Sequence, residues 1–161
     1  MKTPHLLAIA LTTLSFNAMA GDNGLFYVAG GTSARGANFS LAAGTDVDVL
    51  EISSIKLGHP TGNSSAKFVG LSLVQNTVPI KNFNLMFRLG VGKATTTFDN
   101  GASATKMGFG HGVFVGVGAQ YLLSPHFAVR GELNRITYAT TADGSSTAAA
   151  YPLTISALYI F

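Results

Sequence analysis

The feature that most limits what this chain can fold into is a period-two alternation of apolar residues with small or polar ones. The stretch FNLMFRLGVGKA, residues 83–94, shows it clearly. Successive side chains of a β-strand point to opposite faces, so one face here is apolar: Phe83, Leu85, Phe87, Leu89 and Val91. Helical spacing is almost absent after residue 21. The alternation therefore predicts an all-β protein.

Eight segments carry this pattern or one close to it. They cover residues 25–33, 38–44, 47–57, 66–77, 83–94, 107–121, 127–138 and 151–161. Short connections alternate with longer ones that are rich in small polar residues, as in HPTGNSSA and TTTFDNGASATK. Short turns at one rim and longer loops at the other are typical of outer-membrane barrels. We expect an eight-stranded antiparallel up-and-down transmembrane β-barrel.

The composition indicates which face of such a barrel meets lipid and which meets water. Only 11% of residues are charged while 47% are hydrophobic, and a soluble domain normally has about twice that charge. A soluble lipocalin-like carrier would need charges over its outer surface and apolar residues inside. The charges are too few for that, so we expect apolar residues to face lipid. A closed barrel also pairs every strand edge, which suits a chain without cysteine.

The first twenty residues, MKTPHLLAIALTTLSFNAMA, have the three parts of a secretory signal peptide. Lys2 precedes an apolar run, and small residues stand at Ala18 and Ala20. Polar residues interrupt the run before it reaches the length of a membrane-spanning helix. We expect cleavage after Ala20, a barrel domain over residues 21–161, and a location in the outer membrane of a Gram-negative bacterium.

Charged residues inside the strands indicate a polar lumen. In the segment 127–138, apolar residues and Gly131 alternate with Arg130, Glu132 and Asn134. An Arg on the lipid face near the bilayer midplane would cost about 2–4 kcal/mol, so we expect the polar set to point inward. Arg88 falls on the corresponding face of 83–94, and Glu51 joins them although VDVLEISSIKL alternates less regularly. The prediction is a neutral, hydrogen-bonded group that fills the narrow lumen.

The end of the chain, LTISALYIF, places apolar residues on one face of the last strand: Leu153, Ile155, Tyr159 and Phe161. A terminal aromatic residue preceded by alternating apolar positions resembles the signal that the outer-membrane assembly machinery recognises. The resemblance implies that this machinery is a partner of the chain.

A second resemblance covers GVGAQYLLSPHFAVRGELNRITY, residues 116–138. This strand, short turn and strand are similar to the membrane domain of outer-membrane protein A and to its relatives among the opacity-type surface antigens. The resemblance implies a barrel with polar lumen side chains. Separately from this resemblance, we expect a structural or surface-interaction role, adhesin-like or antigen-like, with a possible partner at the loops.

Other functions have weaker support in the sequence. The mild net charge of +3 and the scattered basic residues do not suit a nucleic-acid surface. No spacing of His or Cys predicts a metal, and we expect no cofactor. A narrow solute channel remains an alternative, as does an outer-leaflet lipid-modifying enzyme. His59 with Ser64 is the only catalytic candidate, and its spacing fits poorly, so we expect no enzyme.

Four basic residues are expected towards the outer rim: Lys67, Lys93, Lys106 and Arg135. There they could meet outer-membrane lipid, in particular lipopolysaccharide phosphates. Simple solvation at the loop bases is the alternative interpretation.

Overall fold

A computed structural model describes residues 24–33, 36–58, 64–77, 80–98, 106–139 and 146–161. The expected signal peptide and its cleavage site lie outside these residues, as does His59. Within the described residues, the structure holds no helix long and apolar enough to cross a membrane.

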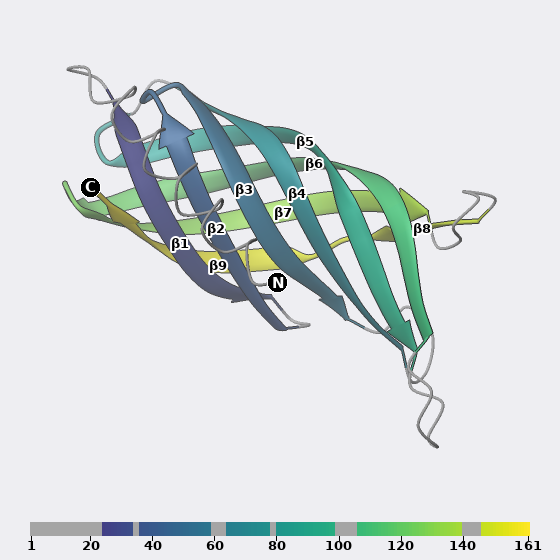
Figure 1. The fold of residues 1–161 in the computed structure, drawn as a ribbon. Helices are drawn as coiled ribbons and strands as arrows, with labels where there is room; N and C mark the ends of the chain where they lie inside the picture. Colours follow the sequence, from purple (N-terminus) through teal and green to yellow (C-terminus); the bar gives the residue numbers. More distant parts are fainter. Residues whose placement is uncertain (1–23, 34–35, 59–63, 78–79, 99–105, 140–145) are drawn as a thin grey trace, which may run out of the picture.

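The described residues form nine β-strand elements that close into one barrel (Figure 1). They are β1 (Leu25–Ser33), β2 (Gly36–Gly44), β3 (Asp48–Gly58), β4 (Ser64–Asn76), β5 (Phe83–Phe98), β6 (Lys106–Ser124), β7 (Phe127–Ala139), β8 (Thr147–Ala150) and β9 (Leu153–Ile160). All pairings are antiparallel, and β1 pairs with β9 to close the sheet. Because β8 and β9 are two parts of one barrel strand, the eight-stranded barrel is confirmed.

The last barrel strand differs from its prediction. We expected one continuous strand over 151–161, but β8 lies further upstream and is separated from β9 at Tyr151 and Pro152. Proline has no N–H for the ladder, and here its carbonyl instead accepts a hydrogen bond of 3.1 Å from Asn134 N. The sequence predicts a loop for the segment TAAA, because its small residues carry little strand signal.

Other strands are longer than predicted, mostly on the side of the longer loops but at the turn rim for the end of β6. β5 continues to Phe98 instead of ending at residue 94, and β6 begins at Lys106 and runs to Ser124 instead of covering 107–121. The β-branched run Thr95–Thr97 extends the β4–β5 and β5–β6 ladders. β2 and β4 likewise begin two residues before their predicted starts, and the remaining strand limits lie within one residue of prediction.

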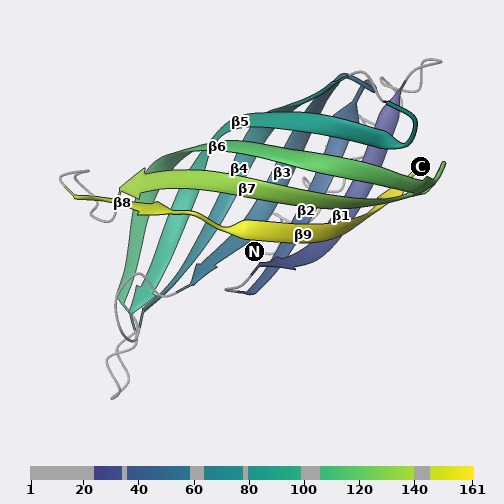
Figure 2. The ribbon, with the colours of Figure 1, turned by 180° about the vertical axis from the view of Figure 1, so that it is seen from behind.

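The two rims of the barrel differ, as Figures 1 and 2 show from opposite sides. The β2–β3, β4–β5 and β6–β7 connections lie at the rim that holds the C-terminus and the start of β1, which we call the turn rim. One of these turns is closed by a hydrogen bond of 2.8 Å from Thr45 N to Asp48 O. The end of β1 and the start of β4 lie at the opposite rim, which we call the loop rim.

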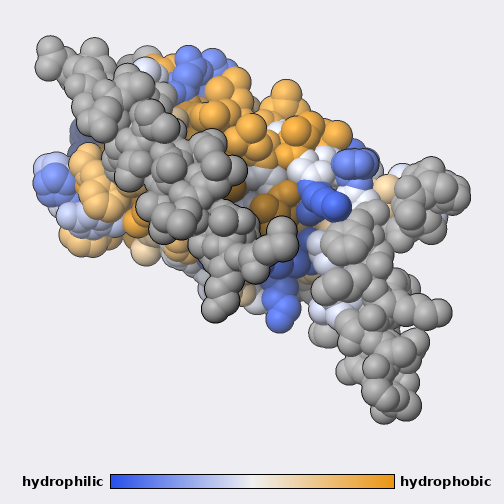
Figure 3. Space-filling view, in the orientation of Figure 1, coloured by the Kyte–Doolittle hydropathy of each residue, from blue (hydrophilic) through white to orange (hydrophobic). Residues whose placement is uncertain are grey.

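The outer and inner faces separate apolar from polar side chains. Outward residues such as Leu89 and Val115 are 61% and 51% exposed, and they form an apolar belt with their neighbours. In Figure 3 this belt is visible as hydrophobic surface across the middle of the molecule, with hydrophilic groups toward its ends. Along β7, burial alternates without exception from Phe127 to Tyr138. The predicted facing of this strand is therefore correct.

Candidate functional site: the charged layer of the lumen

The lumen is filled by three layers of side chains. The layer next to the turn rim is apolar and contains Tyr27, Ala29, Ala42, Val49, Val74, Met86, Ala128, Leu158 and Ile160. The layer next to the loop rim is also apolar and contains Ile55, Leu57, Ala66, Phe68, Ala94, Phe114, Ile136 and Tyr138. Between them lies a charged layer. On β5, for example, Arg88 stands between Met86 of one apolar layer and Ala94 of the other.

The centre of the charged layer is Glu51 on β3. Its side chain is fully buried and forms ion pairs with both Arg88 and Arg130. The Oε2 atom of Glu51 lies 2.8 Å from Nη1 of Arg130, and the hydroxyl of Tyr27 donates a hydrogen bond to the same oxygen. A buried carboxylate needs such partners, since an unpaired charge in this environment is strongly unfavourable.

Glu132 on β7 balances the second positive charge. Its two carboxylate oxygens lie 3.2 and 3.1 Å from Nη1 of Arg88, and one of them lies 3.5 Å from Nη1 of Arg130. The hydroxyl of Thr154 donates a further hydrogen bond of 3.2 Å to Glu132. Two Arg and two Glu thus form one connected group that is formally neutral.

Uncharged side chains complete the layer. Arg88 donates from Nε to the hydroxyl of Ser72 at 3.2 Å, and Arg130 donates from Nη2 to Gln120 Oε1 at 3.2 Å. The two guanidinium groups also lie over aromatic rings, Arg88 over Phe114 at 5.0 Å and Arg130 over Tyr27 at 4.8 Å. Such cation–π contacts favour a desolvated guanidinium.

Glycines on β6 leave the room that this group occupies. Gly116 stands opposite Arg88 and Asn134, and Gly118 stands opposite Glu132. A Cβ atom at Gly118 would lie 3.1 Å from Glu132 Cγ and 2.5 Å from the carbonyl oxygen of Gly131. A larger residue would therefore collide with the wall and with the carboxylate side chain.

The structure brings together four of the five residues that the sequence placed in the lumen group. Asn134 also points inward and is only 1% exposed, but neither atom of its side-chain amide makes a hydrogen bond within the described part of the chain. Sequence reasoning missed Tyr27, Ser72 and Thr154 as partners. Their inward positions follow from strand alternation, but their contact with the charges depends on the stagger between distant strands.

The remaining predicted residues lie elsewhere. Leu153, Ile155 and Tyr159 point outward from β9, and Phe161 follows that strand with its ring 4.8 Å from that of Tyr159 and 5.0 Å from that of Phe26 on β1. The expected cations belong to the loop-rim halves of their strands: Lys67 on β4, Lys93 on β5, Lys106 on β6 and Arg135 on β7.

The structure shows no convergent set of histidines in the residues it describes. His126 lies in the β6–β7 turn with Nδ1 3.0 Å from Ile160 O, whereas His111 points outward in the loop-rim half of β6. Of the predicted catalytic pair, His59 is outside the described residues, and Ser64 begins β4. No group of three His, Asp or Glu side chains in the described segments could hold a metal ion.

Several solved structures are similar to this barrel. The Neisserial surface protein NspA aligns with a TM-score of 0.65 at 10% identity, over 86% of this chain and 95% of that one. The N-terminal β-barrel domain of Pseudomonas aeruginosa OprF gives 0.63 at 14% identity, over 88% and 99%. The chain has the fold of a small outer-membrane β-barrel. Ail, the attachment invasion locus protein of Yersinia pestis, gives 0.59 at 13% identity, over 88% of this barrel and 100% of Ail.

No protein-family model matches this barrel, and no curated protein matches its sequence. The low identities to the solved structures mean that the likeness concerns the fold. Closed antiparallel pairing and an apolar outer belt are features that a bilayer imposes on any small barrel. The charged layer described above is argued from this chain's own residues.

Proposed function

We propose that the protein is an integral outer-membrane barrel whose lumen is closed by its own side chains, and which acts through its surface or by supporting the envelope. The observation that carries this proposal is the neutral charged layer held between two apolar layers. All four charged residues are at most 5% exposed. Every one of them has an ion-pair partner within the layer. Such a group suits a structural role better than an ion pathway.

A solute channel would need a continuous wet path past Arg88, Arg130 and Glu132. The two apolar layers argue against one. Next to the loop rim the rings of Phe68 and Phe114 pack edge to face with centroids 5.5 Å apart, and next to the turn rim Met86 and Leu158 are each 1% exposed. Water would have to cross both layers before it reached the charges.

A surface role is supported by analogy with proteins of the same fold. NspA is described as a surface protein, and Ail as an attachment invasion locus protein. Because a fold hosts many functions, a loop partner has to be found by experiment. We infer a non-enzymatic role, and a direct check is acyl release from outer-membrane lipids by the wild type and by His59→Ala. Acyl release that the substitution abolishes would favour the lipid-modifying enzyme instead.

Conductance across a planar lipid bilayer tests the closed lumen. Folded protein should leave the bilayer current at its baseline over the whole voltage range. Steady, voltage-independent steps of current would instead establish a channel and overturn the proposal. Gel mobility of the same preparation shows beforehand that the barrel is folded, so an absence of current cannot result from unfolded protein.

The proposed location includes export in a Gram-negative bacterium with removal of residues 1–20. N-terminal sequencing of the protein recovered from outer membranes should give a sequence beginning at Gly21. A sequence that begins at Met1 would show that the segment is retained, and the export part of the proposal would then be wrong.

A further inference from the structure

Two lysines stand directly opposite each other on the outer surface near the loop rim. Lys56 on β3 and Lys67 on β4 are cross-strand partners, and both side chains are exposed. Like charges in directly opposite positions destabilise a sheet. The stem of Lys56 lies over Gly36, where a Cβ atom would come within 2.5 Å of Lys56 Cδ. The stem of Lys56 therefore packs toward β2, while its Cα stays directly opposite that of Lys67 on β4, and an anion between the two ammonium groups would relieve their repulsion.

The described part of the chain offers no carboxylate on this face. Its four acidic residues lie elsewhere: Asp46 and Asp48 at the turn rim, and Glu51 and Glu132 in the lumen. Lys93 on β5, which stands opposite His111 on β6, is a further lysine in the loop-rim half of this sheet. Among the described residues, the charged side chains on the outer face of β3 to β5 close to the loop rim are therefore all lysines.

A hollow of about 680 Å³ surrounds the lysine pair and is lined by several hydroxyl groups. Besides Lys56 and Lys67, its polar residues are Asn38, Ser54, Ser65, Thr95 and Thr97. Ammonium and hydroxyl groups are the donors that a phosphate group accepts from. We call this space the head hollow.

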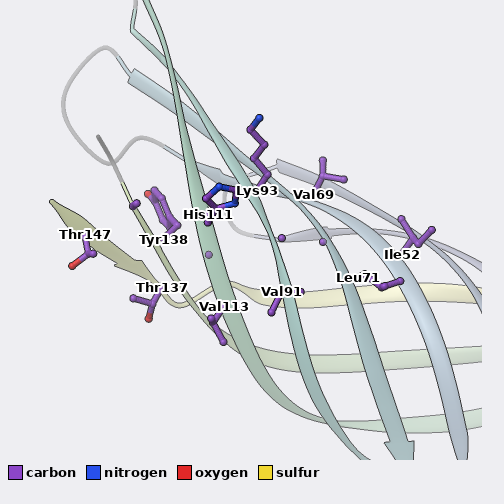
Figure 4. Close-up of a pocket in the computed structure, with 14 residues that line it drawn as sticks. Ile52, Val69, Leu71, Val91, Lys93, His111, Val113, Thr137, Tyr138 and Thr147 are labelled. Atoms are coloured by element: carbon purple, nitrogen blue, oxygen red, sulfur yellow. The ribbon is translucent and has the colours of Figure 1, made fainter. Parts of the chain in front are cut away.

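A second hollow, of about 900 Å³, lies next to it on the apolar belt. Its walls include Ile52, Leu71, Val91 and Val113, and Figure 4 shows Lys93 and His111 side by side along it. Val69 lines both hollows, so the two adjoin at this residue. We call this second space the chain hollow. Its apolar lining can contact a hydrocarbon chain, and it lies on the face of the barrel that meets lipid.

We propose that the two hollows form one site for a phosphorylated, acylated lipid of the outer leaflet. Its phosphate lies between Lys56 and Lys67 in the head hollow, and an acyl chain lies against Val91 and Val113 in the chain hollow. A soluble polyanion would match the lysines but would leave the chain hollow unused. The inference rests on the outer-membrane location proposed above, since only there does the loop rim meet the phosphates of the outer leaflet.

The test uses the full mature chain folded in detergent micelles, with diphosphorylated lipid A as the probe. Native mass spectrometry counts bound lipid during a titration. We expect saturable binding of one lipid, weakened at least tenfold when lipid A is replaced by its dephosphorylated form. This comparison needs no variant, so it does not depend on the folding of a mutant protein.

Variants then locate the site. Lys56→Gln and Lys67→Gln should each weaken lipid A binding about tenfold, whereas Lys81→Asn, which removes one lysine at the turn rim, should leave it unchanged. Val91→Trp fills the chain hollow without adding charge and should also weaken binding. Leu89→Trp is the matched control, because Leu89 lies on the same face of β5 two residues away and does not line the hollow.

Heat-dependent gel mobility of every sample separates this inference from the proposed function. A wild-type barrel that folds but binds phosphorylated and dephosphorylated lipid A equally would overturn the lipid site and leave the barrel proposal standing. Equal binding by folded Lys56→Gln and Lys67→Gln would do the same. If heparin, a soluble sulfated glycan, displaced lipid A and bound as tightly in wild type and Val91→Trp, the acyl part of the site would be wrong.

Discussion

Arg88 on β5 and Glu132 on β7 form an ion pair inside the lumen although their strands are not neighbours in the sheet. The strand between them, β6, presents Gly116 and Gly118 at these positions. A side chain at either glycine would fill the space through which the two charges meet. The pair thus depends on three strands at once and links their positions around the barrel.

Removal of one charged side chain of this pair should strongly destabilise the barrel. Arg88→Met leaves Glu51 and Glu132 with a single Arg between them, so we expect the free energy of unfolding to fall by about 3–5 kcal/mol. Urea titration in lipid vesicles, followed by far-UV circular dichroism, measures this change. Arg88→Met combined with Glu132→Gln restores neutrality and should be less destabilised than the sum of the two single variants. Strict additivity would show that the two side chains do not interact.

Substitution of the inward-facing glycines of β6 by larger residues should destabilise the barrel. Gly118→Ala places a Cβ atom against Gly131 O and Glu132 Cγ, and we expect a loss of about 1–3 kcal/mol. Gly131→Ala is the matched control, since no atom lies within 4 Å of its added Cβ. It should leave stability unchanged or raise it by about 0.5–1 kcal/mol. Equal effects in the same urea titration would contradict the close packing of the charged layer.

An arginine placed on the apolar belt should lower the stability of the barrel by an amount that depends on its depth in the bilayer. Leu89 is 61% exposed and lies near the middle of the belt, so Leu89→Arg should lower stability in vesicles by about 2–4 kcal/mol. Thr95→Arg, on the same face and closer to the loop rim, should change it by about 0–1 kcal/mol. Vesicles of different thickness provide a further readout. Similar losses for both variants would show that the belt does not meet hydrocarbon as proposed.

The aromatic contacts at the turn rim should assist closure of the barrel. The Tyr159 ring lies 5.1 Å from that of Phe127 on β7 and 4.8 Å from that of Phe161, which contacts β1 through Phe26. We expect Tyr159→Ala to reduce the fraction of folded protein in outer membranes several-fold. Tyr121→Ala, another outward tyrosine at this rim, is the control. Equal amounts of both variants would show that Tyr159 has no special part in assembly.

The sequence predicts the barrel and its facing well because a bilayer imposes a strict alternation. Leu133 outside and Glu132 inside follow from period two alone. Even Glu51, in an irregular stretch, points inward because an ionised carboxylate is unfavourable in lipid. Strand limits were predicted less well. The polarity of the threonines after Ala94 predicts a loop, although a strand that extends beyond the bilayer can be polar on both faces.

The details of the lumen group could not be predicted in the same way. Alternation places Tyr27 and Thr154 on the inner face, but their contacts with Glu51 and Glu132 depend on the stagger of strands around the whole barrel. The lysine pair on the outer surface could not be predicted for a similar reason. Lys56 and Lys67 are eleven positions apart in the sequence, and only the β3–β4 register brings them face to face.

The most direct test of the central claim is gel mobility of the membrane-bound protein. The full chain is expressed in a Gram-negative host, the outer membranes are separated, and heated and unheated samples are compared. We predict a band in the outer-membrane fraction that shifts on heating, as a folded barrel resists detergent until it is heated. A soluble periplasmic protein without a shift would contradict the facing of the strands and would favour a lipocalin-like carrier.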